Sequence, residues 1–329
     1  MGPKKTQKNA VLSTNLQSKI SEAQQIQPLQ ATKSIAPGLL LAIFGAIAFS
    51  GKAIIVKLAY RHGVDAVTLI MLRMLFALPF FLLMAWWATY RQGDKSKPPL
   101  TRKDWLGVVS LGFIGYYLSS FLDFAGLVYV SASLERLILY LSPTMVALLG
   151  WVLYKRRVTL RQVMGMGISY CGVVLVFGQE LNVQGPHIAW GALLVFLSAM
   201  TYTIYLVYSG EIVNRLGSLR LAGLASSVAC VCCLLQFALL RPLSAAWVVP
   251  EVVWLSVLNA TLCTALPVLM VMMAVERIGS SAAAQAGMVG PVSTILLSML
   301  LLGEPFTALI GAGTVLVLTG VFVFTQSRR

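Results

Sequence analysis

Charged side chains are scarce in this sequence. Only 11% of its 329 residues are Asp, Glu, Lys or Arg, whereas soluble domains carry about 25%. Hydrophobic residues make up 58% of the chain, and the mean hydropathy is +0.83. A soluble fold has too little interior to bury this much apolar surface, so the composition excludes a soluble protein. It predicts an all-α integral membrane protein that crosses the bilayer several times.

Residues that carry enzyme chemistry are also few. The chain has two histidines and five cysteines, and the cysteines stand in apolar segments without the spacing of a zinc site. Walker A, HExxH and nucleophile-elbow motifs are absent. We therefore expect no enzyme activity, no metal, no other cofactor and no ATP-driven step. A membrane enzyme or lipid-handling protein would need an acid/base pair at one membrane face, and a channel would need a continuous hydrophilic path. The sequence favours neither.

Acidic residues number 11 against 25 basic ones, which gives a net charge of +14. The basic residues do not indicate nucleic-acid binding, because most of them gather in the first 33 residues and a few short loops. With the amino terminus inside, 19 of them fall on the cytoplasmic side and only two outside, as the positive-inside rule requires. The sequence thus predicts ten spans with both termini in the cytoplasm. The spans are expected at 37–60, 66–90, 104–122, 131–154, 160–178, 188–212, 218–240, 252–275, 281–302 and 306–326.

One segment occurs twice. Residues 142–175 and 290–323 align without a gap at a shift of 148 positions, and eight of the 34 pairs are identical. The turn within the first copy reads YKRR, and the turn within the second reads LGEP. The copies lie five spans apart, so the second is inserted upside down, and the positive-inside rule then explains why only one turn is basic. The sequence predicts two inverted five-helix repeats, an architecture found in many secondary transporters.

The segments GKAIIVKLAYRHGVDAVTLIMLR, LSPTMVALLGWVLY and GPVSTILLSMLLLGEPFTALIGAG resemble the EamA-domain proteins of the drug/metabolite transporter superfamily. The resemblance rests on the spacing of Lys57 and Arg73, on the Pro143 and Pro291 segments and on the turn at 303–305. It implies ten helices, cytoplasmic termini and transport of a small metabolite, without naming a substrate. The units that it implies are a polar basic cytoplasmic tail at 1–36, a first repeat at 37–178 and a second repeat at 188–326.

Ionisable residues inside the spans are the first candidates for a substrate site, because a charge at the bilayer centre costs about 2.5–3.5 kcal/mol. Lys52 and Arg73 lie roughly 10 Å from the outer ends of their spans, and Glu135 and Arg136 open the fourth span. In a functional interpretation, Arg73 or Lys52 receives a substrate carboxylate, and Glu135 receives an amine or a coupling proton. In a structural interpretation, Glu135 neutralises one of the two cations or forms an outer gate. Asp123 is expected to end the third span.

Aromatic and amide side chains are the second group of candidates. Tyr140, Tyr202 and Tyr205 could line an amphipathic pocket or be ordinary packing residues. Asn259 and Gln285 lie within the eighth and ninth spans, where each needs a hydrogen-bonding partner. A cavity or a neighbouring helix could supply that partner.

Proline and glycine suggest mechanical roles. Pro143 and Pro291 each interrupt a helix and free a backbone carbonyl one turn earlier, so we expect a hinge in each repeat. Glycines in the fifth and tenth spans allow close helix contact and are expected to form scaffold or a dimer surface. Glu304 stands in an outer turn, where a helix N-terminus favours a carboxylate, and a structural role is expected.

These features predict a secondary transporter that moves a small metabolite by alternating access. Export of amino acids or similar amphipathic solutes is favoured, and efflux of cationic drugs is the alternative. The expected partners are a small-molecule substrate, the lipid bilayer and, if the chain forms a homodimer, a second copy; no nucleic acid is expected. The expected location is the plasma membrane, as a multi-pass protein of the bacterial inner membrane.

Overall fold

The protein is an all-α bundle. The computed structural model describes residues 35–90, 100–155 and 158–326, and these ranges contain helices and no strand. Nine helical stretches in them are long and apolar enough to cross a membrane, and Val289–Leu302 is a shorter apolar helix at the expected ninth span. These nine stretches and the shorter helix lie at the positions of the ten expected spans. The tail at 1–34 lies outside the described residues.

The first repeat contains five crossings, of which the third and fourth are segmented. The third span is wider than an α-helix in its middle, where seven residues are π-helical. Its elements are α2 (Ile35–Tyr60), α3 (Ala66–Tyr90), α4 (Arg102–Leu111), the π-helix η1 (Gly112–Leu118), α5 (Ser119–Leu127), α6 (Ala132–Leu139), α7 (Ser142–Tyr154) and α8 (Leu160–Gln184).

The second repeat repeats this plan. Its elements are α9 (His187–Leu216), α10 (Ser218–Leu240), the 3-10 helix η2 (Leu243–Ala246), α11 (Pro250–Ala260), the π-helix η3 (Thr261–Ala265), α12 (Leu266–Ala286), α13 (Val289–Leu297), the π-helix η4 (Ser298–Leu302) and α14 (Ala308–Gln326).

Several expected boundaries were wrong. Helix α9 continues to Leu216 instead of ending near 212, and α12 runs without a break across 276–280, where the eighth and ninth spans were expected to be separate. The third span continues to Leu127 instead of ending near 122, and the fifth continues to Gln184 instead of ending near 178. Both extensions contain a carboxylate, Asp123 or Glu180, which hydropathy alone treats as a helix end. In the structure each of these carboxylates is buried beside donors of other helices, so the helix does not have to stop there.

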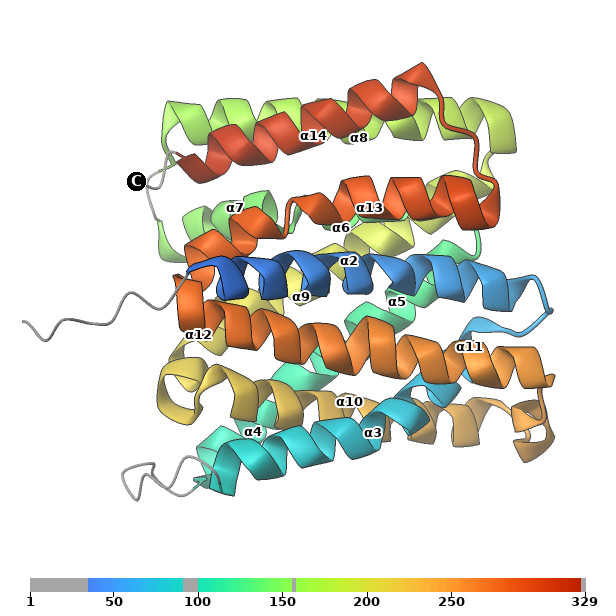
Figure 1. Cartoon of the computed structure of the whole chain (residues 1–329), viewed down its shortest axis with the longest axis vertical. Helices are drawn as coiled ribbons and strands as arrows, with labels where there is room; N and C mark the ends of the chain where they lie inside the picture. The colour runs from blue at the N-terminus through green and yellow to red at the C-terminus, as the bar shows by residue number, and fades with distance from the viewer. Residues whose placement is uncertain (1–34, 91–99, 156–157, 327–329) are drawn as a thin grey trace, which may run out of the picture.

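The helices lie side by side in an order that reflects the inverted repeat. The pair α8 and α14 forms one edge of the bundle and the pair α3 and α10 forms the opposite edge, with the broken helices α6, α7 and α13 and the long helix α2 between them (Figure 1). The start of α2 and the end of α14 lie at the same end of the bundle (Figure 1). This is the inner end according to the distribution of Lys and Arg.

Close packing of α8 on α14 supports the pseudo-twofold symmetry. A Cβ atom added at Gly165 would lie 2.6 Å from Gly320 O, and one added at Gly172 would lie 2.6 Å from Gly313 O. A shift of 148 positions turns Gly165 into Gly313 and Gly172 into Gly320, so the two contacts exchange with each other. These glycines therefore form scaffold within one chain, as one of the two expectations had it. This face is not free to form a dimer surface.

Both repeats break their fourth helix at the same place. Helix α6 ends at Leu139 and α7 begins at Ser142, while α12 ends at Ala286 and α13 begins at Val289. A shift of 148 carries 140–141 onto 288–289, so the two breaks coincide within one residue. Pro143 lies in the first turn of α7 and Pro291 in the first turn of α13, where a missing N–H costs nothing. The expected interruption of both helices is thus present in the structure.

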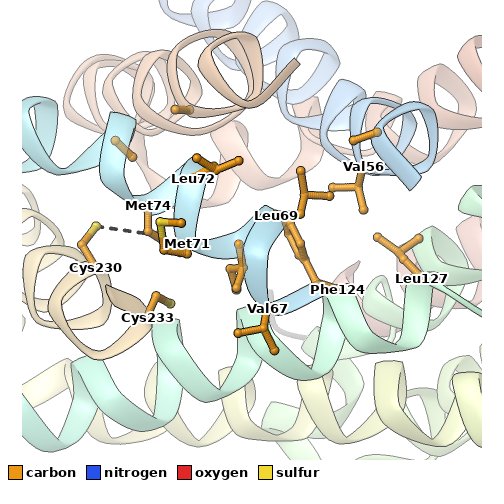
Figure 2. Close-up of a cluster of buried hydrophobic side chains, with 14 of the residues drawn as sticks. Val56, Val67, Leu69, Met71, Leu72, Met74, Phe124, Leu127, Cys230 and Cys233 are labelled. Carbon is orange, nitrogen blue, oxygen red and sulfur yellow. Dashed lines mark hydrogen bonds between the residues drawn. The ribbon is translucent and has the colours of Figure 1, made fainter. Parts of the chain in front are cut away.

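A hydrophobic cluster holds the first repeat against α10. Leu69, Met71 and Met74 of α3 pack with Phe124 of α5 and with Cys230 of α10, and Figure 2 shows α3 running between the other two helices. The thiol of Cys230 lies 3.7 Å from the Met74 sulfur, the contact that is dashed in Figure 2. This packing fixes α3 and α5, which carry two charges of the candidate site.

Candidate functional site

The buried charges of the first repeat meet at one place. Lys52 of α2 lies between two carboxylates, with its Nζ atom 2.5 Å from Asp123 Oδ2 and 3.1 Å from Glu135 Oε1. Glu135 is 0% exposed and Lys52 is 6% exposed. Removing one partner of a buried ion pair typically costs about 3–5 kcal/mol, so these three groups depend on one another. Lys52 is thus within ion-pair distance of Glu135, which is one of the pairings that the structural interpretation named.

Asp123 was expected to be a helix-end residue, and this was wrong. It lies within α5, one turn before Leu127, and is 3% exposed. The π-helical turn at Gly112–Leu118 precedes it and changes the rotation of the helix after it. One feature of the sequence could have indicated the role of Asp123. A lysine inside a span, such as Lys52, needs a carboxylate partner, and Asp123 is one of the few acidic residues near a span.

Arg73 of α3 joins the two repeats. Its Nε atom donates a 3.1 Å hydrogen bond to Thr264 Oγ1, in the π-helix η3 of the second repeat. Thr264 in turn donates to Asn259 O at 2.8 Å, a backbone carbonyl that the π-helical turn leaves available. The guanidinium carbon lies 5.1 Å from the centre of the Phe124 ring, within the range of a cation–π contact. Arg73 has no ion pair with Glu135 among the described residues.

Arg136 reaches from the broken helix of one repeat to the broken helix of the other. Its Nη2 atom lies 3.5 Å from Ser50 Oγ, and Ser50 donates to Gly290 O at 2.9 Å. Gly290 is the second residue of α13, and a Cβ atom added there would lie 2.6 Å from Arg136 Nη2. The guanidinium therefore occupies space that only a glycine leaves open. Its Nε atom is buried and has no hydrogen-bond partner among the described residues.

The five charges form what we call the central cluster. Its members are Lys52, Arg73, Asp123, Glu135 and Arg136, all at most 9% exposed. The corresponding positions of Glu135 and Arg136 in the second repeat are Ala283 and Ala284. The charges therefore come from one repeat, while the second repeat contributes neutral groups, Thr264 and Gly290.

A second group of contacts lies at the outer end of the bundle, where Glu304 of the second repeat reaches the first repeat. Glu304 Oε1 accepts a hydrogen bond from Ala132 N at 2.9 Å, and its Oε2 atom accepts one from Ser133 Oγ at 3.0 Å. Glu180 accepts from both the N–H and the hydroxyl of Ser131. Two carboxylates thus hold the N-terminus of α6, which a helix dipole favours. We call this group, with the bond from Arg61 to Leu302 O, the outer closure.

Glu304 accepts hydrogen bonds at a helix N-terminus, but that helix is α6 of the other repeat. The helix that follows Glu304, α14, is preceded by Thr307, whose Oγ1 atom accepts a hydrogen bond from Ile310 N at 3.3 Å. Sequence placed Glu304 next to α14 and therefore suggested the wrong helix N-terminus. The role of Glu180 was missed, because the fifth span was expected to end at 178.

The tyrosine candidates lie apart from the central cluster. Tyr205 is buried with its hydroxyl 3.3 Å from that of Tyr116, and its ring stacks on Tyr202, which is 36% exposed. Tyr116 precedes Asp123 by seven residues, about 10 Å along the span toward the inner end. Tyr140 is half-buried at the break after α6, where its N–H bonds to Arg136 O.

The two amide candidates have different outcomes. Asn259 is 1% exposed and its Oδ1 atom has no partner among the described residues. Its backbone carbonyl reaches Arg73 through Thr264. Gln285 lies in α12, but its side chain is outside the described residues.

Two cavities in the described part of the structure lie away from the central cluster. A cavity of about 420 Å³ lies between α3 and α12, lined by apolar side chains that include Trp86 and Trp87. A second cavity of about 300 Å³ lies between α6, α8 and α9. No residue of the central cluster lines either one. In the part of the chain that the structure describes, no group of three or more His, Cys, Asp and Glu residues could hold a metal ion.

An all-α membrane bundle of two inverted repeats, with buried charges at their interface, has the architecture of secondary transporters. Residues 36–178 and 189–326 each match the EamA-like transporter family, and the chain belongs to this family. It is a multi-pass membrane transporter of the drug/metabolite transporter superfamily, as the resemblance implied.

Similar proteins agree with this assignment. The chain is 29% identical over 308 residues to the uncharacterized transporter YcbK of Bacillus subtilis (strain 168), covering 88% of this chain and 94% of that one. It is 25% identical over 293 residues to an uncharacterized transporter of Archaeoglobus fulgidus, covering 88% and 98%. A protein of known crystal structure shares the fold with a TM-score of 0.60 and 19% identity, covering 90% of this chain and 99% of that one.

Proposed function

We propose that this protein is a secondary transporter that moves a small amphipathic metabolite, such as an amino acid, across the bacterial inner membrane by alternating access, in the direction of export. One observation carries the proposal. Arg136 of the first repeat contacts the start of α13 in the second, so the central cluster lies where the two repeats meet. The contacts of a solute bound there would change whenever one repeat moved against the other.

The geometry offers a means for that movement. Each repeat has a broken helix close to the central cluster. The second piece of each broken helix has a proline in its first turn. A broken helix can change the angle between its pieces without losing the hydrogen bonds within either piece. The outer closure links the repeats in the described conformation, and opening toward the outside requires Glu304 to leave the N-terminus of α6.

The central cluster fits an amphipathic solute better than a cationic drug. Both of its carboxylates already face Lys52, whereas Arg136 lacks an ion pair within the described residues. Asp123 Oδ1 and Glu135 Oε2 have no hydrogen-bond partner among the described residues, but Lys52 lies between the two carboxylates, so an apolar cation bound there would compete with Lys52 for them. Efflux of cationic drugs is therefore the less favoured of the two expected activities.

A counterflow experiment tests the proposed function. The full-length protein is reconstituted in liposomes that contain a mixture of unlabelled amino acids, and uptake of each labelled amino acid from outside is followed. An alternating-access carrier accumulates the label transiently against its own gradient, because the trapped solute drives exchange. A matched control is the Gly167→Ala variant, since a Cβ atom at this position meets nothing within 4 Å.

Two results would contradict the proposal. Equilibration without transient accumulation would indicate a channel. Transport that continues unchanged in both Lys52→Met and Glu135→Gln would separate transport from the central cluster. Right-side-out and inside-out vesicles compared under the same gradient test the direction.

A further inference from the structure

We propose that Arg136 is the anchor for a carboxylate of the substrate, so that the solutes carried are small organic carboxylates, amino acids included. This inference rests on the proposed function and names the chemistry of its substrate. It commits to one of the three buried cations, where the sequence had favoured Arg73 or Lys52.

The other two cations are engaged. Lys52 faces two carboxylates at 2.5 and 3.1 Å, which leave its charge compensated. Arg73 is held by Thr264 and lies against the Phe124 ring. To bind a substrate carboxylate, either of them would first have to give up a protein partner.

Of the three cations of the central cluster, Arg136 is the one with no ion pair and no hydrogen bond shorter than 3.5 Å among the described residues, although its guanidinium carbon lies 5.6 Å from the centre of the Phe49 ring. It is 9% exposed, its Nε atom makes no hydrogen bond, and its Nη2 atom makes only a long contact of 3.5 Å with the Ser50 hydroxyl. A buried guanidinium donor without an acceptor is costly, because it has lost its hydrogen bond to water. A carboxylate matches the planar fork of these donors in a bidentate arrangement.

Charge points to the same class of substrate. The central cluster holds three cations and two carboxylates, which leaves one positive charge in excess when all five are ionised. The nearby carboxylates of the outer closure, Glu180 and Glu304, already accept hydrogen bonds from the first residues of α6. One substrate carboxylate at Arg136 would therefore neutralise the cluster.

The place of Arg136 also links binding to movement. Its guanidinium lies over Gly290, in the first turn of α13, and therefore beside the break of the ninth span. Ser50 contacts both the guanidinium and Gly290 O. A carboxylate bound here would lie between α6 of one repeat and α13 of the other, the two helices that are broken.

Matched sets of ligands test the inference on the purified full-length protein. One set is leucine, 4-methylpentanoate and 3-methylbutylamine, and a second is phenylalanine, 3-phenylpropanoate and 2-phenylethylamine. Within a set the side chain is constant while the amine or the carboxylate is removed. We expect the carboxylates to raise the thermal unfolding temperature and the amines to leave it unchanged. At 100 times the dissociation constant, a ligand raises the ratio of folded to unfolded protein about 100-fold.

Two variants place the effect at Arg136. Arg136→Gln removes the charge, and Gly290→Ala leaves Arg136 in the chain but puts a methyl group 2.6 Å from the position of its Nη2 atom. We expect both variants to weaken carboxylate binding at least tenfold. Gly290→Ala displaces only the end of a flexible side chain, so it keeps the inference testable if Arg136→Gln does not fold. Gly167→Ala is the matched glycine control and should bind as the parent does.

The outcomes are distinct from those of the proposed function. Stabilisation by the amines alone, or carboxylate binding that is retained in Gly290→Ala, would overturn the inference. Liposomes that exchange amines but not carboxylates would overturn it too and leave the transporter proposal standing. Carboxylate binding that depends on Arg136, without exchange of any solute, would support the anchor and contradict the proposed transport.

Discussion

Lys52 Nζ and Asp123 Oδ2 lie 2.5 Å apart in the interior of the bundle, although 71 positions separate the two residues in the chain. The pair joins α2 to α5, and Glu135 of α6 is the third member, 3.1 Å from the same ammonium group. Three of the five helices of the first repeat are thus held by one charged group.

The Lys52 group should respond to mutation in a particular order. Lys52→Met leaves two buried carboxylates facing each other and should lower the free energy of unfolding by about 3–5 kcal/mol. The triple variant Lys52→Met, Asp123→Asn, Glu135→Gln removes all three charges and should be more stable than the single variant. Unfolding in denaturing detergent measures both. A triple variant that is less stable than Lys52→Met would show that the charges do not compensate one another.

The outer closure should control access from outside. Glu304→Ala removes the acceptor of Ala132 N and Ser133 Oγ, so the outer ends of the repeats should separate more often. Ser298 is buried next to Ser133, and a Ser298→Cys thiol reports the opening. We expect a membrane-impermeant maleimide to label this thiol several times faster in the Glu304→Ala background. The parent without Ser298→Cys corrects for the native cysteines, and equal labelling rates would argue against a closure at this place.

The two prolines should act on movement and not on binding. Pro143→Ala and Pro291→Ala restore an N–H group near each break and favour a continuous helix. We expect each to slow counterflow severalfold while the dissociation constant of the solute changes little. Pro79→Ala, within the unbroken helix α3, is the comparison. Equal slowing by Pro79→Ala would remove any special role of the breaks.

Two glycines of α8 should differ sharply in stability. Gly172→Ala places a methyl group 2.6 Å from Gly313 O, a backbone atom that has little room to shift, and should destabilise the protein by about 1–3 kcal/mol. Gly167→Ala meets nothing within 4 Å and should be neutral or stabilising, since alanine favours helix by about 1 kcal/mol. Thermal unfolding of both variants decides this. Equal effects would mean that α8 and α14 do not pack closely.

Asp65 should make the start of α3 sensitive to acid. Its side chain accepts hydrogen bonds from Val67 N and Thr68 N, which makes it the N-cap. Partial burial acts to raise the pKa of Asp65, but the bonds from Thr68 and Val67 and the charge of Arg241 outweigh it and hold this pKa below its usual value. The stabilisation is therefore complete above a pH of about 4 and is lost as the pH falls through the lower folded-state pKa.

Two variants separate the cap from the charge of Asp65. Asp65→Ala should cost about 1 kcal/mol at neutral pH, because it removes the capping oxygen. Asp65→Asn keeps a capping oxygen that does not titrate, so it should cost less and should remove this part of the acid dependence. Unfolding measured between pH 3 and 7 compares them, and an Asp65→Asn variant with the parent's acid dependence would exclude Asp65 as its source.

The sequence by itself determined the number of crossings, their order and the repeat. These follow from local properties: the length of apolar runs, the placement of Lys and Arg, and a shift of 148 that carries Pro143 onto Pro291 and Gly165 onto Gly313. The bilayer enforces such properties on each segment separately, because every span must satisfy its own backbone and its own length. Lys52 and Glu135 could be singled out for the same reason, as charges that are expensive at that depth.

Only the tertiary structure decided which charges meet. Asp123 was expected to end a helix, Glu180 lay beyond the expected end of its span, and Glu304 was expected to serve the helix that follows it, because hydropathy and spacing describe one segment at a time. Their partners, Lys52, Ser131 and Ala132, come from helices far away in the chain. The position of Arg136 over Gly290 depends in addition on a pseudo-twofold packing of two breaks. Contacts of this kind arise from helix rotation and crossing, which the order of residues along one helix does not contain.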